Sequence, residues 1–142
     1  MKLECSLDKI KYAVTQAEKI TGKNLTLPIL NSILIIASGK SIKIRSTNLS
    51  LGIEIEIPAK IESEGVVAIK GDITSNAFSG MSGDTVSLEL KGENLLVTTK
   101  SSRMMIKTVP HEDFPTIPVV SGDTVVLRYR IAVNGSMWQT TI

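Results

Sequence analysis

The chain has 142 residues, 42% of them hydrophobic, which is enough for one packed domain and too little for two ordinary ones. Its 16 basic and 14 acidic residues leave a formal charge of +2, which excludes a strong overall attraction to nucleic acid or membranes, so only a local patch could supply one. Cys5 is the only cysteine, and we expect it to be a buried structural thiol. No apolar run reaches the roughly 18 residues of a membrane span, so we expect a cytoplasmic protein.

The first half of the chain is predicted to form a strand, a helix and three further strands. Residues 1–5 alternate in polarity, and residues 7–21 carry apolar side chains at the spacing of one buried helical stripe: Ile10, Ala13, Val14, Ala17 and Ile20. Ser6 or Asp8 can cap this helix, and Gly22 can end it. Pro28 makes its surroundings a connecting segment, because proline lacks the donor that a central strand needs. Alternating polarity then predicts strands over residues 32–37, 41–46 and 50–57.

The second half repeats this order after Pro58. The pattern predicts a strand, a short helix and three strands over residues 65–70, 72–81, 85–91, 94–99 and 103–109. In the short helix, Asp72 is the expected cap, and Ile73, Ala77 and Met81 form the expected apolar edge. The chain therefore reads as a duplicated β-α-β-β-β unit, with repeats at about 1–57 and 65–109. The predicted fold class is α+β, with two four-stranded sheet units and two helices packed on one face of antiparallel sheet.

The last residues, 119–142, are predicted to form a β-hairpin tail around the turn signal Asn134-Gly135. Before that turn, apolar positions (Val125, Leu127, Tyr129, Ile131, Val133) alternate with a second set (Val126, Arg128, Arg130, Ala132). Alternating strands left in water are costly, so the tail either folds back on its own domain or associates with a second copy. The pattern leaves both possibilities open.

Three short motifs carry a family resemblance. Residues 26–31 read Thr-Leu-Pro-Ile-Leu-Asn after the first helix, residues 46–49 read Ser-Thr-Asn-Leu between two strands, and residues 113–115 read Asp-Phe-Pro after the last strand. Over residues 1–118 the chain resembles the amino-terminal domain of the bacterial DNA sliding clamp, the DNA polymerase III beta subunit. The resemblance implies a DNA-clamp-like domain from a ring of head-to-tail subunits, each with three such domains, whose helices line the central hole.

The resemblance also implies a function in DNA replication. A sliding clamp is a processivity factor that contacts duplex DNA without reading its sequence, associates with like domains, and binds the replicative polymerase and clamp loader. In the family, the second and third domains form the cleft for these partners, so the cleft is expected to be missing here. The tail does not resemble the start of a second domain, and a truncated or recombined gene, a fusion, or a natural short form would each explain it.

The candidate DNA-binding residues are Lys11, Thr15, Lys19, Lys23 and Asn24. The first three recur at i, i+4 and i+8, opposite the apolar stripe of the first helix, and mobile lysine cations attract phosphates without locking onto bases. The resemblance implies that a basic residue in the following loop approaches DNA, which makes Lys23 the substitute and Asn24 a donor to phosphate. The competing interpretation is that these lysines only solvate an exposed face.

No residue set predicts catalysis, a metal or a cofactor. His111 lies in a loop beside Glu112 and Asp113, where solvation is the expected role, and no nucleophile accompanies it. Residues 80–83 lack the lysine of a phosphate-binding glycine loop. The expected protein is therefore not an enzyme. The alternative to a clamp domain is a stand-alone interaction or scaffold module with the same fold and no DNA binding.

Overall fold

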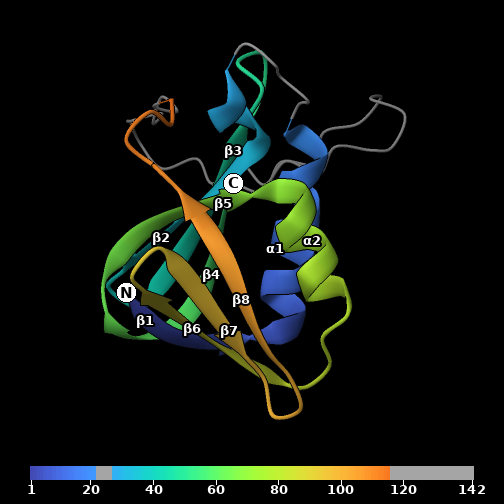
Figure 1. Ribbon diagram of the computed structural model, residues 1–142, viewed down its shortest axis with the longest axis vertical. Helices are drawn as coiled ribbons and strands as arrows, with labels where there is room; N and C mark the ends of the chain where they lie inside the picture. Colours follow the sequence, from blue (N-terminus) through green and yellow to red (C-terminus); the bar gives the residue numbers. More distant parts are fainter. Residues whose placement is uncertain (22–26, 116–142) are drawn as a thin grey trace, which may run out of the picture.

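The computed structural model describes residues 1–21 and 27–115, which form eight strands, two α-helices and one 3-10 helix (Figure 1). In chain order these are β1 (Lys2–Ser6), α1 (Leu7–Ile20), η1 (Pro28–Asn31), β2 (Ser32–Ser38), β3 (Ser41–Thr47), β4 (Gly52–Ser63), β5 (Gly65–Lys70), α2 (Gly71–Ser79), β6 (Thr85–Lys91), β7 (Asn94–Thr98) and β8 (Arg103–Val109). Apart from the short η1, the order β-α-β-β-β occurs twice. The loop with Lys23 and Asn24 and the predicted hairpin tail lie outside the described residues.

The strands pair all the way round in the order β1-β4-β3-β2-β5-β8-β7-β6 and close again at β1. The two predicted four-stranded sheet units are therefore joined into one closed barrel, which the sequence pattern did not predict. The physical reason is that the first strand of each half joins both halves. β1 lies between β4 of its own half and β6 of the other, and β5 lies in the same way between β8 and β2.

β4 continues to Ser63, although proline was expected to end it near Ile57. The strand changes neighbours at this point: Pro58 is its last residue paired with β3, and Ala59 is its first paired with β1. Since the proline sits at the junction between two ladders, its missing N–H interrupts neither of them in mid-strand. The single long strand is what links β3 to β1.

Two strand segments have a paired neighbour on only one side within the described part of the chain. Residues 52–57 of β4 pair with β3, while β1 covers only the later residues of β4. Residues 103–107 of β8 pair with β7, while β5 reaches only Thr108 and Val109. Large exposed apolar side chains stand at both places, with Leu49 and Leu51 just before β4 and Met105 within β8. We call these segments the β4 edge and the β8 edge.

The two helices lie side by side on one flank of the barrel, and each packs its apolar side against the strands (Figure 1). The buried stripe of α1 is as predicted, except that Leu7 joins it and Ile20 is only half-buried. Inward-facing residues of the strands complete the core, among them Ile33, Ile35, Ile42, Ile44, Leu88 and Leu95. Cys5 is part of this core, as expected, and burial raises the pKa of its thiol to about 12.

The predicted apolar edge of α2 is buried in part: Met81, just after the helix, lies in the core and Ala77 packs against it, but Ile73 does not. Gly71, Thr74 and Phe78 face the core, whereas Ile73 is 50% exposed. The helix begins at Gly71 after Lys70, so Asp72 is not its cap, and its carboxylate accepts instead from the neighbouring amide of Ile73. Phe78, the largest apolar side chain of the helix, takes the buried position, and Ile73 is left facing solvent.

The motif at residues 46–49 has a structural explanation. Ser46 is buried, and its hydroxyl donates to the carbonyl of Ala17 at 2.7 Å, which ties β3 to α1. The Thr47 hydroxyl donates to the carbonyl of Leu51 at 2.9 Å, and the Asn48 side-chain oxygen accepts from two amides that follow it. Short polar side chains are favoured in such turns because they replace backbone hydrogen bonds.

Candidate nucleic-acid interface

The solvent face of α1 carries the clearest candidate for phosphate contact. Lys19 is exposed in the last turn of the helix, where a cation is also favoured by the helix dipole. Lys9 and Tyr12 are exposed on the same helix, with Asp8 also exposed near its start. The face is therefore mixed in charge, with its free cations toward the two ends of the helix.

Lys11 has a partner inside the protein. Its ammonium group donates to the carbonyl of Met81 at 2.8 Å, and the side chain is half-buried between the helices. Met81 follows the C-terminal end of α2, where unpaired carbonyls and the helix dipole favour a cation. The contact lets Lys11 hold the end of α2, and it diverts this ammonium from the solvent-facing role expected from helical spacing.

We predict that Lys11→Met lowers the free energy of unfolding by about 0.5–1.5 kcal/mol, the usual contribution of one hydrogen bond. Methionine keeps the apolar stem and removes only the donor. Urea denaturation of the purified chain provides the measurement. Lys9→Met is the matched control, because Lys9 is exposed on the same helix and should change stability by less than about 0.5 kcal/mol. Equal effects at the two positions would contradict a structural role for Lys11.

Thr15 is also half-buried and engaged within its own helix. Its hydroxyl donates to the carbonyl of Lys11 at 2.8 Å. A hydroxyl has a single hydrogen to donate, so Thr15 has none left for a phosphate oxygen in this arrangement. Of the three residues predicted on this helix, the structure therefore leaves Lys19 as the free donor.

α2 adds little positive charge beside α1. Residues 72–83 contain neither lysine nor arginine, and the exposed side chains of the helix include Asp72, Asn76 and Ser79. Lys70, just before the helix, is exposed and is the nearest cation in sequence.

Lys23 and Asn24, the remaining predicted residues, lie outside the described residues. Lys9, exposed on α1, was not among the predicted residues, because the i, i+4 spacing was counted from Lys11.

The only histidine has the surroundings expected of a surface loop. His111 is exposed, and its Nε2 lies 3.8 Å from a carboxylate oxygen of Glu112, whose side chain is more exposed still. Across residues 1–21 and 27–115, no group of three or more His, Cys, Asp or Glu side chains is placed to hold a metal ion. In the same residues, no helix has the length and apolar character needed to cross a membrane.

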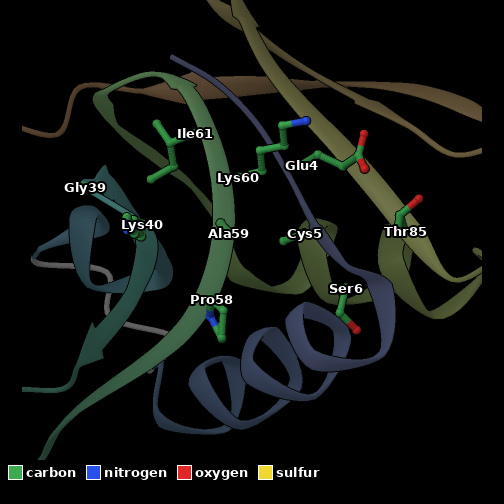
Figure 2. Close-up of a pocket in the computed structure, with 10 residues that line it drawn as sticks. All are labelled: Glu4, Cys5, Ser6, Gly39, Lys40, Pro58, Ala59, Lys60, Ile61 and Thr85. Carbon is green, nitrogen blue, oxygen red and sulfur yellow. The ribbon is translucent and has the colours of Figure 1, made fainter.

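An open hollow of about 700 Å³ lies on the strand side, where β1, β4 and the turn between β2 and β3 meet (Figure 2). Lys40 and Lys60 contribute cations to its lining, and Glu4 stands opposite Lys60 in the strand register. Because the lining mixes both charges, the hollow does not form a patch of one sign for phosphate. Its residues come from strands and a turn, so we do not include it in the helical interface.

The matched family is that of the DNA polymerase III beta subunit, N-terminal domain, whose model covers residues 1–118. The chain is 30% identical over 118 residues to the beta sliding clamp of Micrococcus luteus, covering 83% of this chain and 38% of that protein. The beta subunit structure from Thermotoga maritima aligns with a TM-score of 0.79 at 27% identity, over 85% of this chain and 34% of that one. The Helicobacter pylori beta clamp, solved with a DNA ligase peptide bound, shares the fold with a TM-score of 0.77 at 20% identity, over the same shares of the two chains.

The chain therefore belongs to the family of the DNA polymerase III beta subunit, amino-terminal domain. Proteins of this family are replication processivity factors and not enzymes. The chain spans about a third of the length of the relatives that it matches.

Proposed function

We propose that this chain is a sliding-clamp domain that contacts the backbone of duplex DNA through the α1 surface and self-associates through its two open sheet edges. The observation that carries the proposal is the family match over residues 1–118, which includes every strand and helix described. The exposed Lys19 supplies a flexible cation on the helical flank. Contact of this kind is weak and independent of base sequence, as sliding requires.

Self-association is supported by the charges at the two edges. The outward side of the β4 edge carries Glu54 and Glu56, and the outward side of the β8 edge carries Arg103 and Lys107. Opposite charges facing each other across strands are favourable. Pairing the β8 edge of one copy with the β4 edge of the next gives a head-to-tail interface, and such an interface forms a ring when the rotation closes.

We predict that Lys19→Met weakens binding to duplex DNA and lowers the slope of log affinity against log salt concentration by about 1, the value for one lost phosphate contact. Fluorescence anisotropy of a short labelled duplex, titrated at several low salt concentrations, measures both quantities. The control is Lys91→Met, because Lys91 is exposed at the end of β6, and the turn that follows β6 lies away from the helices (Figure 1). If the two variants lose the same affinity, or if neither does, the α1 surface is not the DNA contact.

A specific observation favours the second candidate, an interaction or scaffold module without DNA binding. Lys11 is engaged by Met81, α2 has no cation, and Asp8 and Asp72 are exposed on the two helices. Two exposed carboxylates reduce the attraction that Lys19 and Lys9 provide. The same titration separates the candidates, because a scaffold module would show no duplex binding at any salt concentration.

A further inference from the structure

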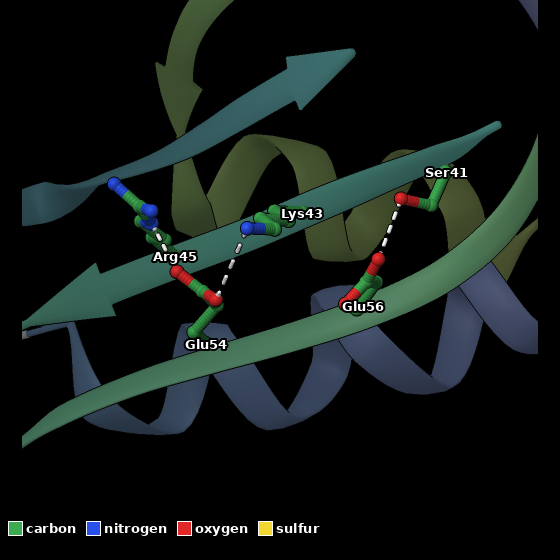
Figure 3. Close-up of polar contacts among 5 residues, drawn as sticks. All are labelled: Ser41, Lys43, Arg45, Glu54 and Glu56. Atoms are coloured by element: carbon green, nitrogen blue, oxygen red, sulfur yellow. Dashed lines mark hydrogen bonds and ion pairs between the residues drawn. The ribbon is translucent and has the colours of Figure 1, made fainter. Parts of the chain in front are cut away.

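The charges beside the β4 edge indicate which charges a further strand paired with it should carry. On the outward face of this sheet, Arg45 of β3 forms an ion pair with Glu54 of β4, and Lys43 approaches the same carboxylate at 3.9 Å (Figure 3). Glu56 accepts a hydrogen bond of 2.6 Å from the Ser41 hydroxyl. Positive charges on β3 thus face negative charges on β4. A strand added on the other side of β4 is favoured if it continues the alternation with positive charges.

On the inward face of the same segment, an added strand is favoured if its side chains are apolar. Ile53 and Ile55 are only half-buried against the core, while Ile57 at the end of the segment is buried. A neighbouring strand would cover the first two if its own inward positions were apolar. The β4 edge therefore selects a strand that alternates apolar residues with basic ones.

Residues 124–133 of the chain, outside the described residues, have this composition. Leu127, Tyr129 and Ile131 occupy one alternating set, and Arg128 and Arg130 occupy the other. Alternation places both arginines on one face of an extended segment, whichever direction it runs. The same segment is disfavoured at the β8 edge, whose outward face is basic, because like charges directly opposite each other are destabilising.

We infer that the tail strand, residues 124–133, pairs with the β4 edge of its own chain, with Arg128 and Arg130 beside Glu54 and Glu56. Residues 116–123 separate the tail strand from the end of the described chain, and eight extended residues span at most roughly 30 Å. A domain of this size has a radius of gyration of about 14 Å, so the connection is long enough to reach across its surface. The tail then covers an edge that is otherwise open to pairing with other chains.

The consequence for assembly rests on the proposed function. The β8 edge of a neighbouring copy and the tail strand both present basic outward faces, so they compete for the same β4 edge. The tail strand is attached to the same chain and so has a high effective concentration at the β4 edge, which favours it over the β8 edge of another copy. The tail therefore opposes head-to-tail association until it is displaced.

The experiment is hydrogen exchange of the β4 amides in the full chain, at several protein concentrations, together with sedimentation velocity. Alternate amides of residues 52–57 are already bonded to β3, so the informative ones are those that point away from β3. We expect these outer β4 amides to be protected equally at all concentrations in a monomeric chain. The double variant Arg128→Glu, Arg130→Glu should speed their exchange by about tenfold, because two attractive cross-strand pairs become repulsive. It should also increase association. The double variant Arg128→Lys, Arg130→Lys keeps the charge and should retain the protection.

Three results would overturn this inference: outer β4 amides that are unprotected, protection of them that disappears on dilution together with an oligomer, or protection of them that charge reversal leaves unchanged. The second result would show that another copy covers the edge. Exchange at Ile69, a buried residue of β5 distant in sequence from the tail, reports whether each variant is folded. DNA binding does not enter these measurements, so a failure of the Lys19 titration and a failure of the tail strand remain distinguishable.

Discussion

Phe78→Ala is expected to lower the free energy of unfolding by about 3–5 kcal/mol, the usual cost of removing a buried phenyl ring from a core. Phe78 is 1% exposed and is the largest fully buried side chain among the residues that the structure describes. It is also the main apolar anchor of α2, whose other buried residues, Gly71 and Thr74, offer little apolar surface. Small polar residues give this helix a low intrinsic propensity, so its stability depends on packing. Urea denaturation monitored by circular dichroism measures the loss.

Ile73→Ala is the informative control on the same helix. Because Ile73 is half-exposed and alanine has the higher helix propensity, this substitution should change stability by less than about 0.5 kcal/mol. Phe78→Leu, which keeps much of the volume, should cost well under the full amount. A larger loss at Ile73 than at Phe78 would mean that α2 buries the edge expected from the sequence instead of the one described.

Gly71→Ala is expected to cost about 1–3 kcal/mol, although alanine is normally the better helix residue. A methyl group at this position would lie 3.1 Å from the Thr21 hydroxyl oxygen and 3.3 Å from the backbone carbonyl of Asn31. Neither neighbour can easily move. The Thr21 hydroxyl donates to the carbonyl of Glu18 at 2.6 Å, and the other atom belongs to the backbone at the end of η1. The start of α2 therefore lies too close to the end of α1 for a larger residue.

Gly80→Ala provides the comparison, because a methyl group there meets only the Ala77 carbonyl at 3.9 Å and the backbone is in the ordinary helical region. This substitution should be neutral or stabilise the protein by up to about 1 kcal/mol through a lower entropy of the unfolded chain. Thermal and urea unfolding of both variants measure the difference. If Gly71→Ala also proved stabilising, the close approach of the two helices would be wrong.

Local pattern was sufficient to predict most of the elements. The strands Gly65–Lys70, Thr85–Lys91 and Arg103–Val109 have the predicted bounds, and α1 begins at the predicted residue. These segments show clear periodicity, and their ends carry turn or capping residues. α2 was the weak case, because its few apolar residues define no single face until the barrel is present to receive one of them.

The sequence predicted which residues lie on the candidate interface, but not which of them hydrogen-bond within the protein. Spacing along one helix indicates that Lys11 and Lys19 both project away from the apolar stripe, and it treats them alike. Whether a lysine meets a carbonyl depends on the neighbouring helix, which comes from residues 70 positions later in the chain. For the same reason no pattern within α1 could show that Lys11 holds the end of α2.

The sequence by itself determined most of the strands, the first helix with its buried stripe, and the burial of Cys5, because these properties arise from side chains within one turn or one strand of each other. The tertiary structure alone decided that the barrel closes through β1 and β5, that β4 exchanges partners at Pro58, and that within residues 1–21 and 27–115 two strand segments have a paired neighbour on one side only. These outcomes depend on which distant strands pair. Strand pairing depends on how the whole core packs, that is, on contacts between segments that are distant in the sequence.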